Sequence, residues 1–323
     1  MEAWERSLRP KTLSDFIGQE EIKRRLSLLI EASKARGDSP DHILFYGPPG
    51  LGKTTLASIV AAELSSPFIQ ISGPSITRAG DLAAILSGLD KGSVLFIDEI
   101  HRIPRPCEEM LYSAMEDFRI DIVVGKGVMA KTIRVELYPF TLIGATTRLG
   151  LLTGALRSRF GVIERIDFYP VEELEKIVFR SASILGVGIS EGAARELALR
   201  GRGTPRIVNR LLKRVRDYAQ VEGKNFIDEE ITFKALDFYG VDPYGLDSSD
   251  WKILSVIIEK FSGGPVGIET LAAALNEEPD TISEVYEPYL MRMGFIERTK
   301  RGRVATQRAY DLWRRRGCNG VFG

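Results

Sequence analysis

One segment, residues 47–54 with the sequence GPPGLGKT, constrains the fold of this chain more than any other. It fits the pattern of a glycine, four residues of any kind, and then Gly-Lys-Thr. It also lies between the apolar run 43–46 and a helical pattern over residues 54–64. A glycine-rich loop between a strand and a helix turns backbone N–H groups and the helix N-terminus toward phosphates. The loop therefore predicts a nucleotide-binding α/β domain.

Individual side chains of this loop have separate tasks. Lys53 brings a positive charge to the β and γ phosphates, and the hydroxyl of Thr54 is suited to ligate Mg²⁺. The cofactors that the loop predicts are therefore ATP and Mg²⁺. The residues expected to contact nucleotide here are Gly50, Gly52, Lys53, Thr54 and Thr55.

Length and composition predict a soluble cytoplasmic protein of two or three domains. A chain of 323 residues is too long for one compact domain, and its 44 basic residues balance 44 acidic ones, so any nucleic-acid surface must be local. Cys107 and Cys318 have no metal-ligand spacing, which is typical of a reducing compartment. No run approaches the roughly 20 apolar residues of a membrane span, and the charged start does not resemble a signal peptide. We expect no membrane association.

Short apolar runs alternate with helical stretches and predict the buried parallel strands of an α/β sheet. The runs are residues 43–46, 68–71, 94–97 and 141–144. Asp98 and Glu99 follow the third run, at the carboxyl end of a strand, where such sheets bind ligands. We expect Asp98 to hold the Mg²⁺ shell and Glu99 to orient or deprotonate the attacking water.

Two hydroxyls follow the fourth run. Either Thr146 or Thr147 could hold the lytic water or sense the γ phosphate, although threonine is also a favoured residue at strand ends. The residues alone do not choose between these interpretations. His101 is interpreted as a helix-start or packing residue rather than as a base.

Two arginine positions have alternative interpretations. Arg157 and Arg159 are either a solvated pair or include a residue that reaches the γ phosphate of a neighbouring subunit, which adds ~10³ to 10⁵ in rate. In residues 203–206, GTPR, Thr204 is expected to cap a helix and Pro205 to open it. Arg206 then lies where the helix dipole disfavours a cation. It either opposes an anion such as an ATP phosphate or points into solvent.

Residues 171–239 have a helical pattern and predict a small all-helical domain. Ser190 and Asp228 are expected N-caps, and Gly186 and Gly223 are expected stops.

Residues 118–135 alternate with period two around Gly125-Lys126-Gly127, which predicts a hairpin inserted before the fourth strand. Apolar side chains crowd its turn, namely Val123, Val124, Val128 and Met129. The hairpin either docks a partner protein or packs as an edge on its own sheet.

The last block predicts three helices, near 250–261, 268–275 and 280–293, followed by a basic hairpin at 294–304. This order resembles a winged-helix domain. Arg298 and Arg303 flank the turn of the hairpin, where we expect contacts with DNA phosphates. Such domains also mediate protein contacts, so a soluble charged hairpin is the alternative.

These segments, in this order, resemble the RuvB family of AAA+ motors, and the resemblance covers essentially the whole chain. Its more specific parts are Leu8-Arg9-Pro10 with Gly18-Gln19, residues 47–54, Asp98-Glu99-Ile100-His101, and the segments 144–148, 156–160, 203–206 and 296–306. Leu149 and Tyr138 depart from the pattern, where we would expect Ala or Ser and Pro. The implied fold is an AAA+ parallel-sheet ATPase domain at 1–170, a small helical domain at 171–241 and a winged-helix DNA-binding domain at 242–323.

The resemblance also implies roles for single residues. Leu8, Arg9 and Tyr169 would border the adenine pocket, and Arg159 would be the finger that acts on a neighbour. Arg206 would be the sensor of the helical domain. Further residues near nucleotide would be Glu116, Asp117, Phe118 and Thr146. Arg298 and Arg303 would touch DNA.

The implied function is ATP-dependent branch migration of Holliday junctions in recombination and repair, by a homo-hexameric ring. The 118–135 hairpin would dock a RuvA-like junction-binding protein, and a RuvC-like resolvase is a further partner that the resemblance allows. The alternative is a DNA-bound loader or initiator that acts as a nucleotide switch. A protein remodeller would leave the basic hairpin unexplained, and a metabolic P-loop kinase would need neither the finger nor the winged helix.

Overall fold

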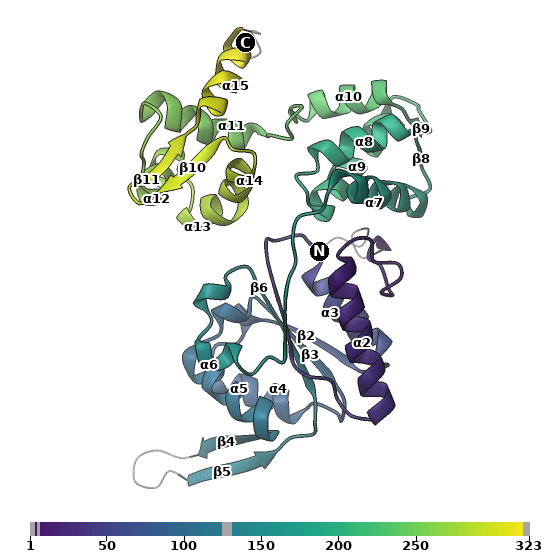
Figure 1. Ribbon diagram of the computed structural model, residues 1–323, viewed down its shortest axis with the longest axis vertical. Coiled ribbons are helices and arrows are strands. Elements are labelled where there is room, and N and C mark those ends of the chain that lie inside the picture. The colour runs from purple at the N-terminus through teal and green to yellow at the C-terminus, as the bar shows by residue number, and fades with distance from the viewer. Residues whose placement is uncertain (1–3, 5–6, 125–130, 319–323) are drawn as a thin grey trace. The chain divides into compact units, whose positions relative to one another are not determined.

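The computed structural model describes residue 4, residues 7–124 and residues 131–318. The chain divides into two compact units, Met1–Phe168 and Tyr169–Gly323 (Figure 1). Within the described residues, no helix combines the length and the apolar character needed to cross a membrane.

The first unit is built on a five-stranded parallel sheet with the strand order β2-β3-β6-β1-β7. Its strands are β1 (Ile43–Tyr46), β2 (Phe68–Ser72), β3 (Val94–Asp98), β6 (Thr141–Thr146) and β7 (Val162–Arg165). The four predicted strands are confirmed. The fifth, β7, was not predicted, because this four-residue edge strand has only two apolar residues followed by Glu164 and Arg165, where a central strand has a continuous apolar run.

Helices cover both faces of this sheet, with α2 and α3 on one side and α4 and α5 on the other (Figure 1). The helices and short 3₁₀ turns are α2 (Glu20–Arg36), α3 (Lys53–Glu63), η1 (Gly73–Ser75), α4 (Ala79–Ser87), η2 (Ile100–Arg102), α5 (Arg105–Asp117), η4 (Leu149–Leu151) and α6 (Gly154–Arg157). The apolar faces of α4 and α5, including Leu82 and Leu111, pack with Leu95 and Leu142 of the strands. This burial fixes the carboxyl ends of β1, β3 and β6 as one rigid edge.

The predicted hairpin forms a separate two-stranded sheet of β4 (Arg119–Val124) and β5 (Lys131–Glu136). Near its base Ile120 is buried, and Ile122 packs against the core of the unit. Ile133, the cross-strand partner of Ile122, is 50% exposed, so the apolar face of the hairpin continues beyond the core. The predicted apolar tip falls on residues 125–130 and on side chains that lie outside the described structure.

The second unit begins with helices α7 (Val171–Ile184), α8 (Glu191–Arg200), α9 (Pro205–Val221) and α10 (Glu229–Phe238). Ser190 and Asp228 accept hydrogen bonds from Ala193 N and Ile231 N, which confirms both predicted caps. The prediction of an all-helical domain was incomplete, because β8 (Gly188–Ile189) and β9 (Phe226–Ile227) form a short parallel pair.

The rest of the second unit has its own apolar core, which includes Leu254, Leu271, Leu290 and Phe295. Its elements are α11 (Ser248–Ser255), the π-helical η5 (Val256–Lys260), α12 (Ile268–Leu275), α13 (Pro279–Thr281), the π-helical η6 (Ile282–Tyr286), α14 (Glu287–Arg292), β10 (Ile296–Thr299), β11 (Gly302–Ala305) and α15 (Gln307–Cys318). The predicted three helices and hairpin are confirmed. The additional helix α15 packs through Ala309, Leu312 and Trp313.

Candidate functional site

The loop between β1 and α3 has the backbone of a phosphate cradle. Gly47, Gly50 and Gly52 have φ angles of 142°, 81° and 106°, which residues with a Cβ rarely adopt. A Cβ on Gly47 would also collide with the carbonyl oxygen of Ile166. Helix α3 begins at Lys53 with no side chain capping its first turn, so its N-terminal N–H groups suit an anion.

Lys53 is held inside this loop. Its side chain is buried, and Nζ donates to Gly47 O at 2.7 Å and to Pro48 O at 2.8 Å. Backbone carbonyls of the loop therefore hold the ammonium, and Lys53 is also the first residue of α3, a position that suits a nucleotide phosphate.

The hydroxyl of Thr54 and the carboxylate of Asp98 meet across the gap between α3 and β3. Thr54 Oγ1 lies 3.4 Å from Asp98 Oδ2, and both side chains are partly buried. Hydroxyl and carboxylate oxygens are the donors that Mg²⁺ prefers, so the residues present fit this ion. The structure thus brings together the two predicted metal ligands.

Glu99 is placed by an unusual backbone conformation. Its φ of 51° and ψ of 45° lie in the left-handed region, and its N–H donates to Asp98 Oδ1 at 3.1 Å. The backbone carbonyl of Glu99 approaches Gly73 so closely that a Cβ there would collide with it. Packing therefore imposes a conformation that turns Glu99 away from the line of the strand, as is common at reactive sites.

The two threonines at the end of β6 have different surroundings. Thr147 Oγ1 lies 3.4 Å from Glu99 Oε2 in a partly buried position. Thr146 is fully buried, and its hydroxyl accepts from Arg148 N at 2.9 Å and lies 2.8 Å from His101 Nδ1. Thr147 is therefore the hydroxyl that shares the surroundings of Glu99, while Thr146 has a structural network.

His101 belongs to the same cluster, which sequence reasoning missed. Its side chain is 5% exposed, and Nδ1 lies 3.4 Å from Glu99 Oε2 as well as close to Thr146. His101 is the second residue of the turn η2, close to the predicted helix start, and its Nδ1 also lies between Glu99, which follows β3, and Thr146 of β6. Its position two residues after Glu99 was the available signal.

Arg159 lies in a second group of side chains, at the C-terminal end of α5. Nη2 donates to Glu116 Oε2 at 2.9 Å, Nη1 donates to Ala155 O at 2.7 Å, and the guanidinium lies 4.5 Å from the centre of the Tyr112 ring. Its side chain is only 19% exposed, so Arg159 is not the solvated arginine of the simpler interpretation.

A polar network holds the hydroxyl of Tyr112 in place. Its hydroxyl lies 3.0 Å from Glu108 Oε1 and 3.0 Å from Thr153 Oγ1, and Thr153 also bonds Glu108 and caps α6. Burial, with the hydrogen bond to Glu108, raises the pKa of Tyr112. Because Glu108, Tyr112 and Glu116 are spaced four residues apart, they lie on one face of α5. Arg159 contacts this face through Tyr112 and Glu116.

The remaining predicted residues of the first unit lie on other segments. Asp117 pairs with Arg119 at 3.0 Å, and Phe118 has a φ of 49° and packs beside the rings of His42 and Phe140. Leu8 is buried at the start of the unit. Asp117 and Phe118 thus end α5 next to the Arg159 group rather than next to the phosphate loop.

The two departures from the family pattern have different surroundings. Leu149 begins the turn η4 and packs partly against the core, while Tyr138 is 63% exposed.

In the second unit, Arg206 is exposed near the start of α9, directly after Pro205 at the first helical position. Thr204 occupies the N-cap position, but the prediction that its side chain caps the helix was wrong. Its hydroxyl instead donates to Arg202 O at 3.3 Å. Tyr169 N donates to Gly203 O at 2.9 Å, so Tyr169 adjoins the loop that carries Arg206.

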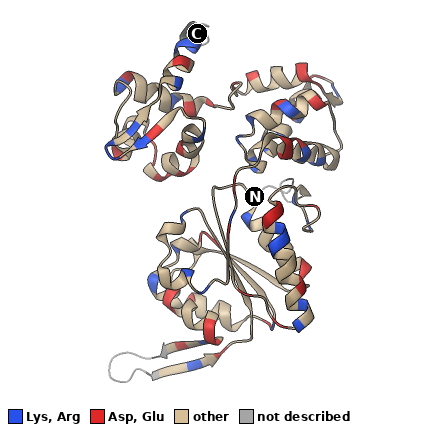
Figure 2. Ribbon diagram, viewed as in Figure 1, with Lys and Arg blue, Asp and Glu red and all other residues tan. Residues whose placement is uncertain are grey.

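The two predicted DNA contacts differ in exposure. Arg303 is 5% exposed, and its guanidinium donates to Glu287 Oε1 at 3.1 Å and Oε2 at 2.8 Å. Arg298, its cross-strand partner, has a side chain that is 62% exposed. Basic residues also gather at the turn after β10 and on α15, where Figure 2 shows them in blue. The accessible basic surface is therefore the turn, not Arg303.

Three family models match consecutive parts of the chain. The Holliday junction DNA helicase RuvB P-loop domain matches residues 8–166, the RuvB AAA lid domain matches 169–242, and the RuvB C-terminal winged helix domain matches 243–314.

Relatives extend these matches over nearly the whole chain. A Holliday junction branch migration complex subunit RuvB from Rubrobacter xylanophilus is 60% identical over 306 residues, which is 95% of this chain and 86% of the relative. The structure of the Thermotoga maritima RuvB Holliday junction branch migration motor is 52% identical, with a TM-score of 0.88, and the match covers 95% of this chain and 98% of that chain.

Proposed function

This chain belongs to the RuvB family of Holliday junction branch migration motors, and from this premise we propose how its residues use ATP. It is an ATP-driven helicase of DNA recombination and repair. The observation that carries the mechanism is the meeting of the phosphate loop with Asp98, Glu99 and Thr147 at one edge of the sheet.

Lys53, Thr54 and Asp98 hold the charged end of the substrate. The loop amides and the ammonium of Lys53 bind the β and γ phosphates of ATP, and Thr55 follows in the same first helical turn. Thr54 and Asp98 would hold Mg²⁺, which when bound adds positive charge beside these phosphates.

Glu99 and Thr147 act on the attacking water. The Glu99 carboxylate accepts the hydrogen bond of that water and aligns it with the γ phosphate, which is the main demand of phosphoryl transfer. Thr147, within 3.4 Å of Glu99, supplies the second hydrogen bond and senses the γ phosphate. His101, which contacts both Glu99 and Thr146, fixes the position of the Glu99 carboxylate relative to the end of β6.

Arg159 completes the site of a neighbouring subunit. It follows α6 and pairs with Glu116 of α5, on segments that do not form the phosphate loop, which supports a role in trans. Glu116, Asp117 and Phe118 would then approach the neighbour's nucleotide together with Arg159. Such a shared site requires a neighbouring subunit, and we propose that the assembly is a homo-hexameric ring.

Arg206 supplies a sensor from the helical domain. An exposed cation at the N-terminus of α9 opposes the helix dipole, and a nucleotide phosphate would relieve that repulsion. Tyr169 adjoins the same loop, and we assign it to the adenine pocket with Leu8 and Arg9.

The hairpin of β4 and β5 is the proposed docking site for a RuvA-like protein. Its base packs on the core, while Ile133 continues the same apolar face into solvent. Contact with a RuvC-like resolvase would follow at the junction, and we place the whole reaction in the cytoplasm.

The wing of the last domain contacts duplex DNA through Arg298, Lys300 and Arg301. The first lies on β10 and the other two in the turn, and all three are exposed. Such contacts engage phosphates and position the protein without reading sequence.

A four-way junction assay tests this function. The protein with ATP, Mg²⁺ and a RuvA-like partner should convert a synthetic junction into two duplexes, and a Lys53→Ala variant should not. ATP-dependent junction binding without strand exchange would instead support the loader. If an Ile133→Asp variant fails in this conversion only when the partner is present, the partner contact lies on the hairpin.

A further inference from the structure

Arg202 lies in the loop between α8 and α9, four residues before Arg206, and has an unusual backbone. Its φ of 55° lies in the left-handed region, where a residue with a Cβ is disfavoured. Gly203 beside it has a φ of 69°, so two consecutive residues adopt this conformation. A strained arginine where glycine would be unstrained points to a need for the side chain.

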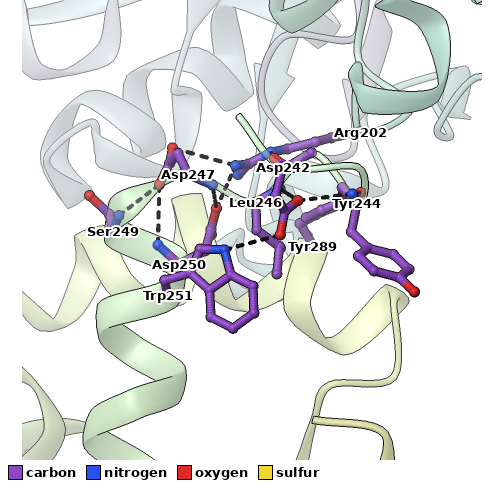
Figure 3. Close-up of polar contacts among 10 residues, drawn as sticks. Arg202, Asp242, Tyr244, Leu246, Asp247, Ser249, Asp250, Trp251 and Tyr289 are labelled. Atoms are coloured by element: carbon purple, nitrogen blue, oxygen red, sulfur yellow. Dashed lines mark hydrogen bonds and ion pairs between the residues drawn. The ribbon is translucent and has the colours of Figure 1, made fainter. Parts of the chain in front are cut away.

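The Arg202 side chain is inserted among residues of the winged-helix domain and the segment that leads to it (Figure 3). Nε donates to Gly245 O at 2.7 Å, and Nη2 bonds Asp250 Oδ2 and lies 3.4 Å from Asp247 Oδ2. The guanidinium also lies 5.0 Å from the centre of the Tyr289 ring. Only 10% of the side chain is exposed, so these contacts are largely shielded from water.

Asp250 depends on this arginine. The residue is fully buried, its Oδ2 also accepts from Asp247 N at 2.9 Å, and its Oδ1 has no hydrogen-bond partner among the described residues. Burial raises the pKa of Asp250 to about 6, while the charge of Arg202 opposes that rise. Removing Arg202 alone would leave a buried carboxylate without its counter-ion.

The segment that receives Arg202 is itself rigid. Asp242 accepts from Tyr244 N at 2.9 Å, from Leu246 N at 2.8 Å and from Trp251 Nε1 at 3.0 Å (Figure 3). Gly245 has a φ of 72°, and a Cβ there would lie 2.6 Å from Arg200 O. The linker is thus packed against α8 on one side and the winged-helix core on the other.

We propose that Arg202 is a positioning residue that locks the winged-helix domain to the Arg206 loop, so that the two domains of the second unit move as one body. The guanidinium of Arg202 is fixed in the winged-helix domain. The backbone carbonyl of Arg202 accepts from Thr204 Oγ1 and, at 3.4 Å, from Arg292 Nη1. A shift of Arg206 on nucleotide exchange is carried through this short loop to the DNA-binding domain. This last step rests on the function proposed above, whereas the locked joint does not.

The joint is tested by spin-label distances in the full chain. Labels are placed at exposed positions of the two domains, through Arg195→Cys and Glu297→Cys with Cys318→Ser. We expect one narrow distance distribution, unchanged by ADP or a non-hydrolysable ATP analogue. Since Arg202→Gln alone can unfold the joint, the test variant is Arg202→Gln with Asp250→Asn, which removes both charges. It should broaden the distribution at least twofold; a broad distribution without these changes, or a narrow one with them, overturns the proposal.

The coupling is then measured on unlabelled protein. The double variant should bind a fluorescent ATP analogue and duplex DNA within about twofold of the unmodified chain. It should complete at least fivefold fewer junction conversions per ATP hydrolysed. The matched control is Glu175→Gln with Arg195→Gln, which removes an exposed ion pair of the same helical domain. An unchanged ratio in the test variant overturns the coupling, whereas absence of strand exchange by the unmodified chain would overturn the proposed function and leave the distance result standing.

Discussion

Arg159 donates through Nη2 to Glu116 Oε2 of its own chain at 2.9 Å. Since the Glu116 side chain is 56% exposed, this ion pair stabilises the subunit by about 0.2–1 kcal/mol. A phosphate of the nucleotide bound to a neighbouring subunit can therefore replace Glu116 as the partner of Arg159. We predict that Glu116→Gln lowers the protein concentration at half-maximal specific ATPase activity about two- to fivefold. A concentration series with and without duplex DNA measures this effect.

The control is Glu109→Gln, which removes an exposed ion pair with Arg105 on the same helix and should change nothing. If Glu116→Gln instead reduces the maximal rate at saturating protein, Glu116 contributes to the neighbour's site and does not merely compete for Arg159.

A mixing experiment tests the trans role of Arg159. Arg159→Ala should reduce turnover by ~10³-fold or more, because the charge it supplies in the transition state is lost, while ATP binding is retained. A Lys53→Ala subunit should not hydrolyse ATP in its own site, but its Arg159 can still act on the site of a neighbouring subunit. Mixed assemblies should therefore regain measurable hydrolysis. No recovery at any mixing ratio, with mixed rings verified by differential tagging, would exclude the trans finger.

The two threonines should separate stability from catalysis. Thr146→Val removes a buried hydroxyl that bonds Arg148 N and His101, and should lower the free energy of unfolding by about 1–3 kcal/mol. Thr147→Val should reduce kcat by ~10²-fold, as loss of one transition-state donor does, with unfolding nearly unchanged. Urea titrations and steady-state ATPase rates measure both quantities. A reversed pattern would assign the sensor to Thr146.

His42 should stay neutral at a pH where an exposed histidine is protonated. Burial lowers its pKa from the ordinary value of 6.5. Its Nδ1 accepts from Leu142 N at 2.8 Å, so the proton is on Nε2, which lies 3.1 Å from Met115 O. Just below pH 6.5 the unfolded chain gains this proton and the folded chain does not, so the contribution of His42 to the free energy of unfolding should fall as the pH drops through 6.5 and level off below the folded pKa.

Imidazole NMR checks this directly, because the chain has only two histidines and a His101→Gln variant leaves one signal. A His42 midpoint at or above 6.5 would contradict the expected direction.

Arg298 and Arg303 should respond to different assays. Arg303→Gln leaves the buried carboxylate of Glu287 without its bidentate partner and should lower the free energy of unfolding by about 3–5 kcal/mol. Arg298→Gln should leave folding intact and reduce the slope of log affinity against log salt for duplex DNA by about 1. An unchanged salt slope for Arg298→Gln would remove Arg298 from the DNA contacts.

The sequence predicted the features that local pattern determines. Apolar runs located the central strands, and the glycine pattern located the phosphate loop, because backbone conformation and burial leave a direct mark on composition. The burial of Arg303 was not predicted, since its carboxylate partner Glu287 comes from helix α14 and periodicity does not show which face of the hairpin is covered. Arg202 was missed for a similar reason: its partners lie 43 to 48 residues ahead and meet only in the tertiary structure.

The place of β1 in the sheet has a consequence for synthesis. β1 carries the phosphate loop, yet its two neighbours in the sheet are β6 and β7, which follow it by about a hundred residues. A nascent chain therefore leaves the ribosome with both edges of this apolar strand open until β6 has emerged, and with one edge open until residue 165 has emerged. Such long-range pairing is slow and prone to aggregation. Chaperones should consequently engage the growing chain before ATP can, and nucleotide binding marks the completion of the domain rather than its beginning.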